Sequence, residues 1–122
     1  MKVAIYGQYY QNSTEPIIRD IFVFFNSKNI EMVIESNFLK MLYEKELVKK
    51  EYKTFDSYKE LDKSFNLMLS IGGDGTILRA ATLVRNSGIP ILGINAGRLG
   101  FLASVQKEDI AAFLQLVVDK NY

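Results

Sequence analysis

Short apolar segments that end at glycine alternate along this chain with segments of helical periodicity. Residues 2–7 and 66–71 are apolar segments, ended by Gly7 and by Gly72 with Gly73. Between them, apolar side chains recur three and four positions apart at Ile17, Ile18, Ile21, Phe22 and Phe25. Strands that alternate with helices form right-handed βαβ units, whose parallel sheet is covered on both faces. The alternation therefore predicts an α/β domain with a mostly parallel sheet.

The same patterns place the individual elements. We expect strands over residues 2–7, 30–35, 66–71 and 90–94, and a short strand over 101–105. We expect helices over residues 16–28, 37–52, 76–86 and 110–117, and a polar connection that can include a short helix over 54–65. Together these elements predict a Rossmann-like or flavodoxin-like three-layer sandwich.

The composition excludes several kinds of chemistry. The 122 residues suffice for one domain, and they contain no Cys and no His. A disulfide framework, a thiolate nucleophile, a His general base and the common zinc sites are therefore excluded. Carboxylates, Lys and Arg, hydroxyls and backbone amides must carry any reaction.

Charge and hydropathy narrow the choice of partners. The 15 Lys and Arg residues balance 14 Asp and Glu residues, which gives no polyelectrolyte surface for nucleic acid or an anionic membrane. The longest dense apolar run, residues 21–25, is far shorter than the roughly 20 residues that span a bilayer. We expect a soluble, cytoplasmic protein that binds neither nucleic acid nor membranes.

Residues 66–106 differ from the rest of the chain. They contain seven of the eight glycines but a single acid, Asp74. Gly72, Gly73 and Gly75 surround this acid, directly after an expected strand and before an expected helix. Glycines let the backbone turn sharply and approach a ligand closely, and the free N–H groups of a helix start attract phosphate. The functional site is therefore expected here.

Asp74 has two interpretations. A carboxylate would repel a phosphate that it faced, so it suits accepting from a hydroxyl or helping to hold a metal that bridges phosphates. Asp is also a common helix N-cap, so Asp74 could simply cap a helix from Thr76. Arg79, one helical turn beyond Gly75, fits a phosphate, but a solvated helix surface explains it equally well. The segment is neither a Walker A motif nor GxGxxG.

A second glycine-bearing segment follows the strand expected over residues 90–94. Asn95 can bond a ligand hydroxyl, and Gly97 and Gly100 are spaced for a tight, exposed loop. Phe101 can offer an apolar face to a base; alternatively, Phe101 is a core residue and Asn95 a turn residue. Ligands of parallel sheets bind at the carboxyl ends of the strands, so both glycine-rich segments should open onto the same edge.

Two motifs together resemble those of the NAD kinase family. They are GGDGTIL at residues 72–78 and NAGRLGFL at residues 95–102, and the resemblance covers nearly the whole chain in order. GGDGT alone also occurs in lipid kinases of the diacylglycerol kinase type, with a near relative in phosphofructokinases, so the second motif is what favours NAD kinases. That family phosphorylates the 2′-hydroxyl of the adenosine ribose of NAD. It uses ATP, or polyphosphate in some members, and a divalent metal, usually Mg²⁺.

The resemblance implies roles for particular residues. Asp74 would act on the ribose hydroxyl as general base or orienter, and Gly75 would share that contact with NAD. Arg79, at the family's basic position in the following helix, would bind NAD, and Phe101 would bind NAD by packing near the adenine. The supporting loops would be shaped by Gly72, Gly73, Thr76, Asn95, Gly97 and Gly100. Such phosphoryl transfer depends on positioning and metal-assisted charge stabilisation and needs no His or Cys.

One departure from the family concerns length. NAD kinases have a second, mostly β domain with further NAD contacts, which these 122 residues do not contain. We therefore expect residues 1–122 to be the N-terminal α/β domain of a longer homodimeric or homotetrameric enzyme, inactive as a fragment. The alternatives are a fragment of a diacylglycerol-kinase-like lipid kinase or a sugar kinase, and a stand-alone nucleotide-binding module.

Overall fold

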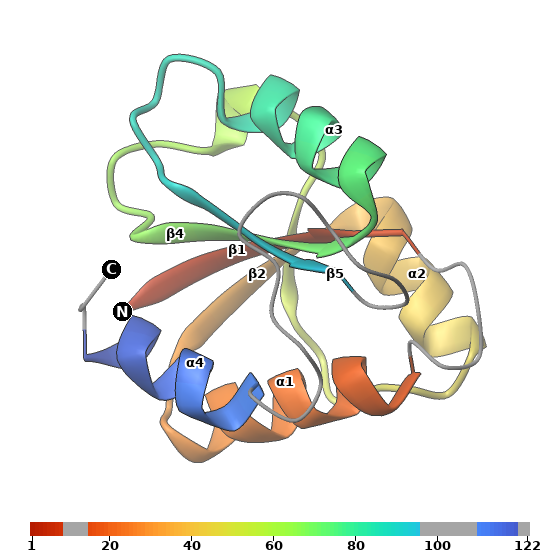
Figure 1. Cartoon of the computed structure of the whole chain (residues 1–122). Coiled ribbons are helices and arrows are strands. Elements are labelled where there is room, and N and C mark those ends of the chain that lie inside the picture. Colours follow the sequence, from red (N-terminus) through yellow and green to blue (C-terminus); the bar gives the residue numbers. More distant parts are fainter. Residues whose placement is uncertain (9–14, 96–109, 120–122) are drawn as a thin grey trace.

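The computed structural model describes residues 1–8, 15–95 and 110–119, and within them the strands form one parallel sheet (Figure 1). The strands are β1 (Lys2–Gly7), β2 (Glu31–Glu35), β3 (Lys53–Phe55), β4 (Leu67–Gly72) and β5 (Ile91–Asn95). The helices are α1 (Glu15–Ser27), α2 (Ser36–Glu44), α3 (Asp74–Val84), α4 (Ile110–Val118) and the 3-10 helix η2 (Tyr58–Glu60). The predicted α/β class with a parallel sheet is confirmed.

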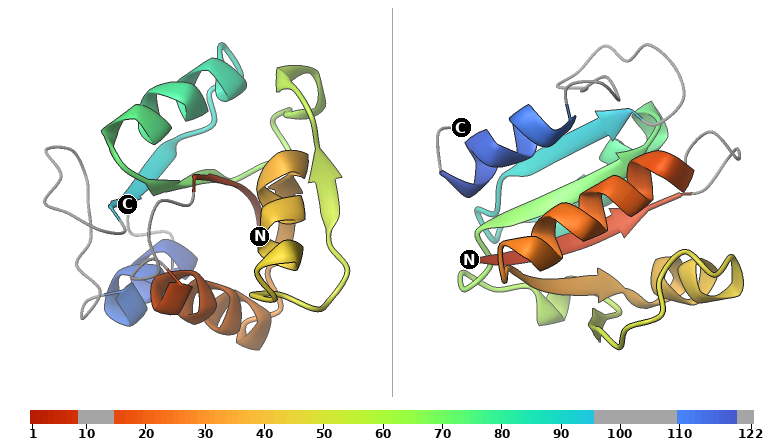
Figure 2. Two further views of the ribbon diagram at one scale, coloured as in Figure 1. Left: turned by 90° about the vertical axis from the view of Figure 1, so that its right-hand side faces the viewer. Right: turned by 90° about the horizontal axis from the view of Figure 1, so that it is seen from below.

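The order of the strands determines which face each helix covers. The order is β3-β2-β1-β4-β5, so the chain moves one way from β1 to β3 and the opposite way from β4 to β5. Because crossovers between parallel strands are right-handed, the two directions place their helices on opposite faces. The helices α1, α2 and α4 accordingly pack on one face of the sheet, and α3 packs on the other (Figures 1 and 2).

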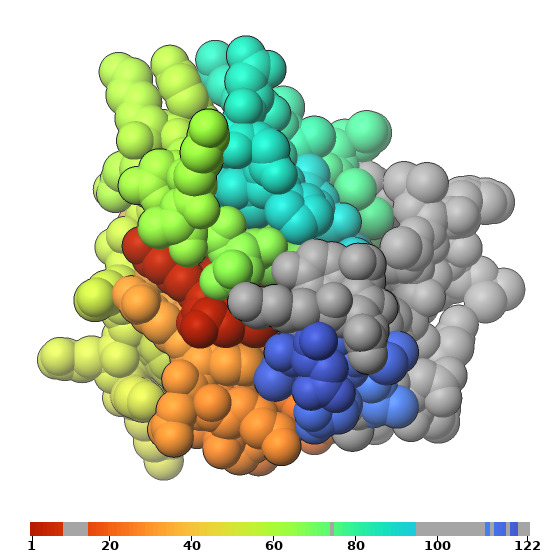
Figure 3. Space-filling model, turned by 90° about the vertical axis from the view of Figure 1, so that its left-hand side faces the viewer, coloured from red at the N-terminus to blue at the C-terminus, as the bar shows by residue number. Residues whose placement is uncertain are grey.

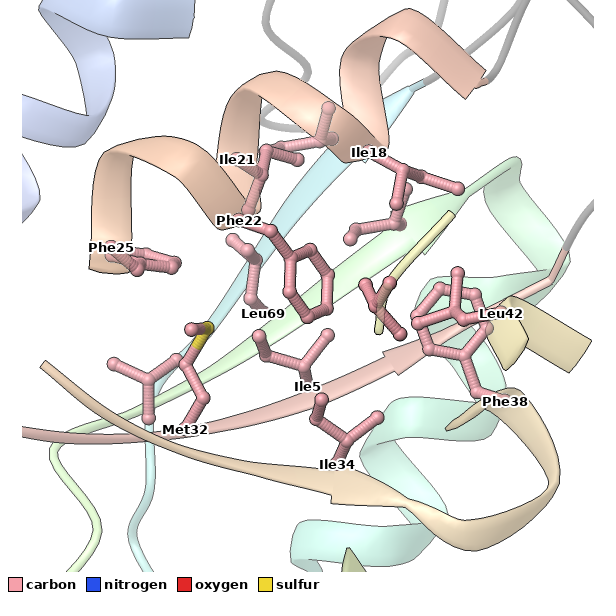
Figure 4. Packing of buried hydrophobic residues seen from close by; sticks show 14 of the residues in the cluster. Ile5, Ile18, Ile21, Phe22, Phe25, Met32, Ile34, Phe38, Leu42 and Leu69 are labelled. Carbon is pink, nitrogen blue, oxygen red and sulfur yellow. The ribbon is translucent and has the colours of Figure 1, made fainter. Parts of the chain in front are cut away.

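Side chains of both sheet faces are buried. In β4, Leu67, Leu69 and Ile71 join the core beneath α1 and α2, whereas Met68 points into the core beneath α3. Figure 4 shows how α1 directs Ile18 and Phe22 toward the first of these cores. Burial on both faces explains why β4 is a continuous apolar run without alternation.

Helix α4 completes the layer that α1 begins. The two helices lie side by side (Figure 3). Leu114 of α4 is fully buried in the core that α1 shares. The helix predicted over residues 110–117 is therefore confirmed as a core element. None of the helices in the described residues combines the length and the apolar character needed to cross a bilayer.

The helix predicted over residues 37–52 is wrong in its second half. Helix α2 ends at Glu44, because Glu46 adopts a left-handed conformation with φ of 57°. The backbone N–H of Leu47 then donates to Leu42 O over 2.9 Å, and that of Glu46 donates to Tyr43 O over 3.0 Å. This pair of bonds is a Schellman ending, and it turns Leu47 back into the core.

Strand β3 was not predicted. It lies partly inside the segment expected to be a polar connection, and its only buried side chain is that of Phe55. The short helix expected in that connection is η2. The short strand expected over residues 101–105 lies outside the described residues.

Candidate functional site

The sheet reverses its strand order between β1 and β4, and the candidate site lies where these two strands end. Gly7 pairs in register with Ile71, so both strands end at the same level. The backbone N–H of Gln8 donates to Ile71 O over 3.0 Å, which holds the chain leaving β1 against the end of β4. In open α/β sheets, a reversal of strand order at the carboxyl ends is the usual place for a ligand.

Two glycines make this junction compact. A β-carbon on Gly7 would lie 2.7 Å from the Phe38 ring and 2.9 Å from Ile71 O. A β-carbon on Gly72 would overlap the Thr76 hydroxyl, and the φ of Gly72 is +154°. Side chains are therefore excluded at both strand ends by the packing of the protein itself.

A hydrogen bond ties the glycine-rich turn to the end of β1. Thr76 Oγ1 donates to Gln8 Oε1 over 2.9 Å, and Thr76 is fully buried. Gln8 Nε2 in turn donates to the Tyr6 hydroxyl over 3.4 Å. Thr76 was expected only as a supporting residue, and Gln8 was not singled out, although it directly follows the glycine that ends β1.

Asp74 is the first residue of α3. The N-cap of this helix is Gly73, which makes no side-chain capping bond, and the helix begins two residues earlier than predicted. The interpretation of Asp74 as the N-cap of a helix from Thr76 is therefore wrong. Instead, Asp74 stands in the first turn, at the positive end of the helix dipole.

Gly75 differs from Gly72. It is exposed, and a β-carbon at this position would meet nothing within 4 Å. Glycine in a helix costs about 1 kcal/mol relative to alanine. The packing of the described residues gives no reason for glycine here, so the open space above Gly75 is available for the close approach of a ligand.

The second motif reaches the same edge. Asn95 ends β5 and pairs in register with Gly72, so the two glycine-rich segments leave neighbouring strand ends, as predicted. Gly97, Gly100 and Phe101 lie outside the described residues.

Beside the turn lies a pocket of about 490 Å³. Its walls combine the end of β1, the start of α2 and the exposed Arg79 of α3. Glu35, at the end of β2, lines the pocket although only 8% of its surface is exposed. Its Oε1 accepts the Phe38 N–H over 2.9 Å and thereby caps α2. Nothing in the sequence singled out Glu35, because its role depends on neighbours that only the fold supplies.

Comparisons with known proteins agree with this geometry. The family model for the ATP-NAD kinase N-terminal domain matches residues 3–122. The NAD kinase of Flavobacterium johnsoniae is 75% identical over all of this chain, and that of Bacteroides fragilis strain YCH46 is 38% identical. This chain spans 42% and 41% of the length of those two relatives.

A solved structure supports the fold. The crystal structure of yeast NADH kinase complexed with NADH superposes with a TM-score of 0.70 over 98% of this chain and 38% of that one. At 17% identity, this likeness shows the fold alone. The family match and the bacterial relatives carry the assignment, and they show that this chain belongs to the NAD kinase family and corresponds to its N-terminal domain.

Proposed function

We propose that an enzyme of the relatives' length that contains this chain transfers the terminal phosphoryl group of ATP to the 2′-hydroxyl of the adenosine ribose of NAD. The observation that carries this proposal is the first turn of α3. Asp74 stands there beside Gly75, whose open side leaves room for a ribose, at the carboxyl edge of the sheet where the strand order reverses. The choice of ATP and NAD as substrates in this proposal rests on the membership of the chain in the NAD kinase family.

In the proposed reaction, Asp74 orients the 2′-hydroxyl and accepts its proton. The ribose oxygen attacks the terminal phosphorus of ATP, the bond from that phosphorus to the bridging oxygen breaks, and ADP leaves. Proton acceptance by a positioned carboxylate typically contributes a factor of roughly 10² to 10⁴ in rate. The positive end of the α3 helix dipole attracts the phosphates that gather there.

Other residues would position the substrates. Gly75 admits the ribose because it carries no side chain, and Arg79 places a cation one turn further along α3. Asn95 starts the second motif beside Gly72. Packing of Phe101 near the adenine, and shaping of the second loop by Gly97 and Gly100, remain predictions.

The donor set suits a magnesium ion that is held mainly by its substrate. Within residues 1–8, 15–95 and 110–119, no three Asp or Glu residues cluster as a metal site would require. Mg²⁺ usually keeps several waters and is bound by one or two carboxylates together with substrate phosphates. A carboxylate such as that of Asp74 would suit that mode, in which the metal would neutralise charge on the phosphates.

Steady-state assay of the full-length enzyme with NAD and Mg-ATP tests the proposal. We expect NADP to form, and Asp74→Ala to reduce kcat by a factor of roughly 10² to 10⁴. Asp119→Ala, which removes an exposed carboxylate at the end of α4, is the matched control and should retain activity. Absence of NADP, or an Asp74→Ala variant as active as the parent, would overturn the assignment.

A further inference from the structure

We infer that the pocket between α2 and α3 holds the nucleoside part of the phosphoryl donor, with the donor's phosphates directed toward Arg79. The inference rests on the proposed function, since it names where one of the two substrates binds. It depends on how charge, apolar surface and burial are distributed over the walls of the pocket.

The two sides of the pocket differ in charge and in exposure. On one side, Glu35 is 8% exposed and Phe38 is 3% exposed. On the other side, Arg79 is exposed, and its guanidinium brings a positive charge to the wall of the pocket. A phosphate would be repelled by Glu35 and attracted by Arg79. A ligand with a neutral end and an anionic end therefore has one preferred orientation.

The neutral end matches a nucleoside. One oxygen of Glu35 is fixed by the Phe38 N–H, and an ionised carboxylate has further lone pairs that can accept from ribose hydroxyls. The half-buried Met41 supplies apolar contact for a base, and the exposed amide of Asn37 can both donate and accept at its edge. A volume of about 490 Å³ is in the usual range for a small-molecule pocket.

The anionic end then points toward the reacting groups. Gly75 and Arg79 are four residues apart in α3, so they lie on the same face of the helix. Phosphates at Arg79 are thus directed along α3 toward its first turn, where Asp74 and the acceptor ribose are proposed to meet. In this arrangement, Arg79 lies between the two substrates.

NAD also contains nucleosides and phosphates, so either ATP or NAD could fit a nucleotide pocket. Steady-state kinetics with each substrate can tell which of them the pocket binds. In the full-length enzyme, we expect Glu35→Gln to raise the KM for ATP about tenfold, in the range for a hydrogen bond to a charged group, and to leave the KM for NAD within twofold. The amide oxygen that this substitution introduces can still accept from the Phe38 N–H, so the cap of α2 is kept. Glu31→Gln is the matched control, because Glu31 lies in the same strand, exposed, at the opposite end.

A second ligand distinguishes binding of the nucleoside part of ATP from binding of its phosphates. Inorganic tripolyphosphate, used as an inhibitor competitive with ATP, should bind equally well to the parent and to Glu35→Gln. Equal weakening of ATP and tripolyphosphate would show that the pocket takes phosphates only. A rise in the KM for NAD instead would assign the pocket to the acceptor, and unchanged constants would show that it holds neither substrate.

Failure of this inference can be distinguished from failure of the proposed function. If the parent makes no NADP, the proposed function fails, whereas the outcomes above arise only with an active parent. If Glu35→Gln does not fold, as judged by its thermal transition, Asn37→Ala takes its place, because Asn37 is exposed and also lines the pocket. Asn37→Ala should likewise raise the KM for ATP, by about three- to tenfold, without moving that for NAD.

Discussion

Gly72 and Gly75 belong to one five-residue motif, yet the structure treats them in opposite ways. Gly72 is buried, and Thr76 occupies the space that a side chain would need. Gly75 is exposed, and none of the residues that the structure describes occupies the space that its side chain would need. The first glycine serves the packing of the turn, whereas we propose that the second serves a ligand. A glycine-rich motif therefore contains two separate requirements, which substitution can distinguish.

The largest effect on stability is expected at Gly72. Gly72→Ala should lower the free energy of unfolding by about 2–4 kcal/mol, because its β-carbon overlaps Thr76 and its backbone disfavours a side chain. Chemical denaturation measures the change. Gly88→Ala is the control: Gly88 also has a positive φ, of 80°, but its surroundings are open. An equal loss in both variants would show that the overlap with Thr76 contributes nothing.

The hydrogen bond between Thr76 and Gln8 is expected to have an intermediate effect. It joins the helix start to the end of β1, so its loss should loosen the first turn of α3. A double-mutant cycle of Thr76→Val and Gln8→Leu should give a coupling free energy of about 1 kcal/mol. Thr76→Ser keeps the hydroxyl and should retain most of the stability and activity. Strictly additive single effects would contradict the proposed link.

The smallest change in stability, with the opposite sign, is expected at Gly75. Gly75→Ala should raise the free energy of unfolding by about 0.5–1 kcal/mol, because alanine is the better helix former and has room. The same substitution should raise the KM for NAD in the full-length enzyme. Thermal denaturation and steady-state kinetics measure the two effects. If Gly75→Ala were less stable than the parent and kept the same KM for NAD, Gly75 would serve packing rather than a ligand, contrary to our proposal.

Local patterns in the sequence explain which parts of the fold could be predicted. The apolar runs before Gly7 and Gly72 predicted β1 and β4, and the two motifs predicted that Asn95 and the glycine-rich turn share one edge of the sheet. The end of α2 could not be predicted, because a glutamate rather than a glycine adopts the left-handed conformation at position 46. Strand β3 has a single buried side chain, which is too weak a pattern to recognise.

The polar residues of the site were harder to predict than its glycines. Gln8 gains its partner 68 positions away, and Glu35 lines a pocket whose opposite wall comes from another helix. Neither residue lies in a motif, so only the paired strand ends bring them to the site. The N-cap of α3 was also hard to predict, although it depends on neighbouring residues only. Gly73 is the N-cap, whereas Asp74 is of a residue type that is favoured there.

The reversal of strand order between β1 and β4 also places the two ends of the proposed nucleotide site on opposite sides of one central strand pair. Glu35 belongs to the half that contains β1, β2 and β3, whereas Arg79 belongs to the half that contains β4 and β5. A nucleotide that touches both residues would act as a cross-link between the halves. Its binding energy would then add to the hydrogen bonds that join β1 and β4, and substrate saturation would raise the free energy of unfolding of the whole domain.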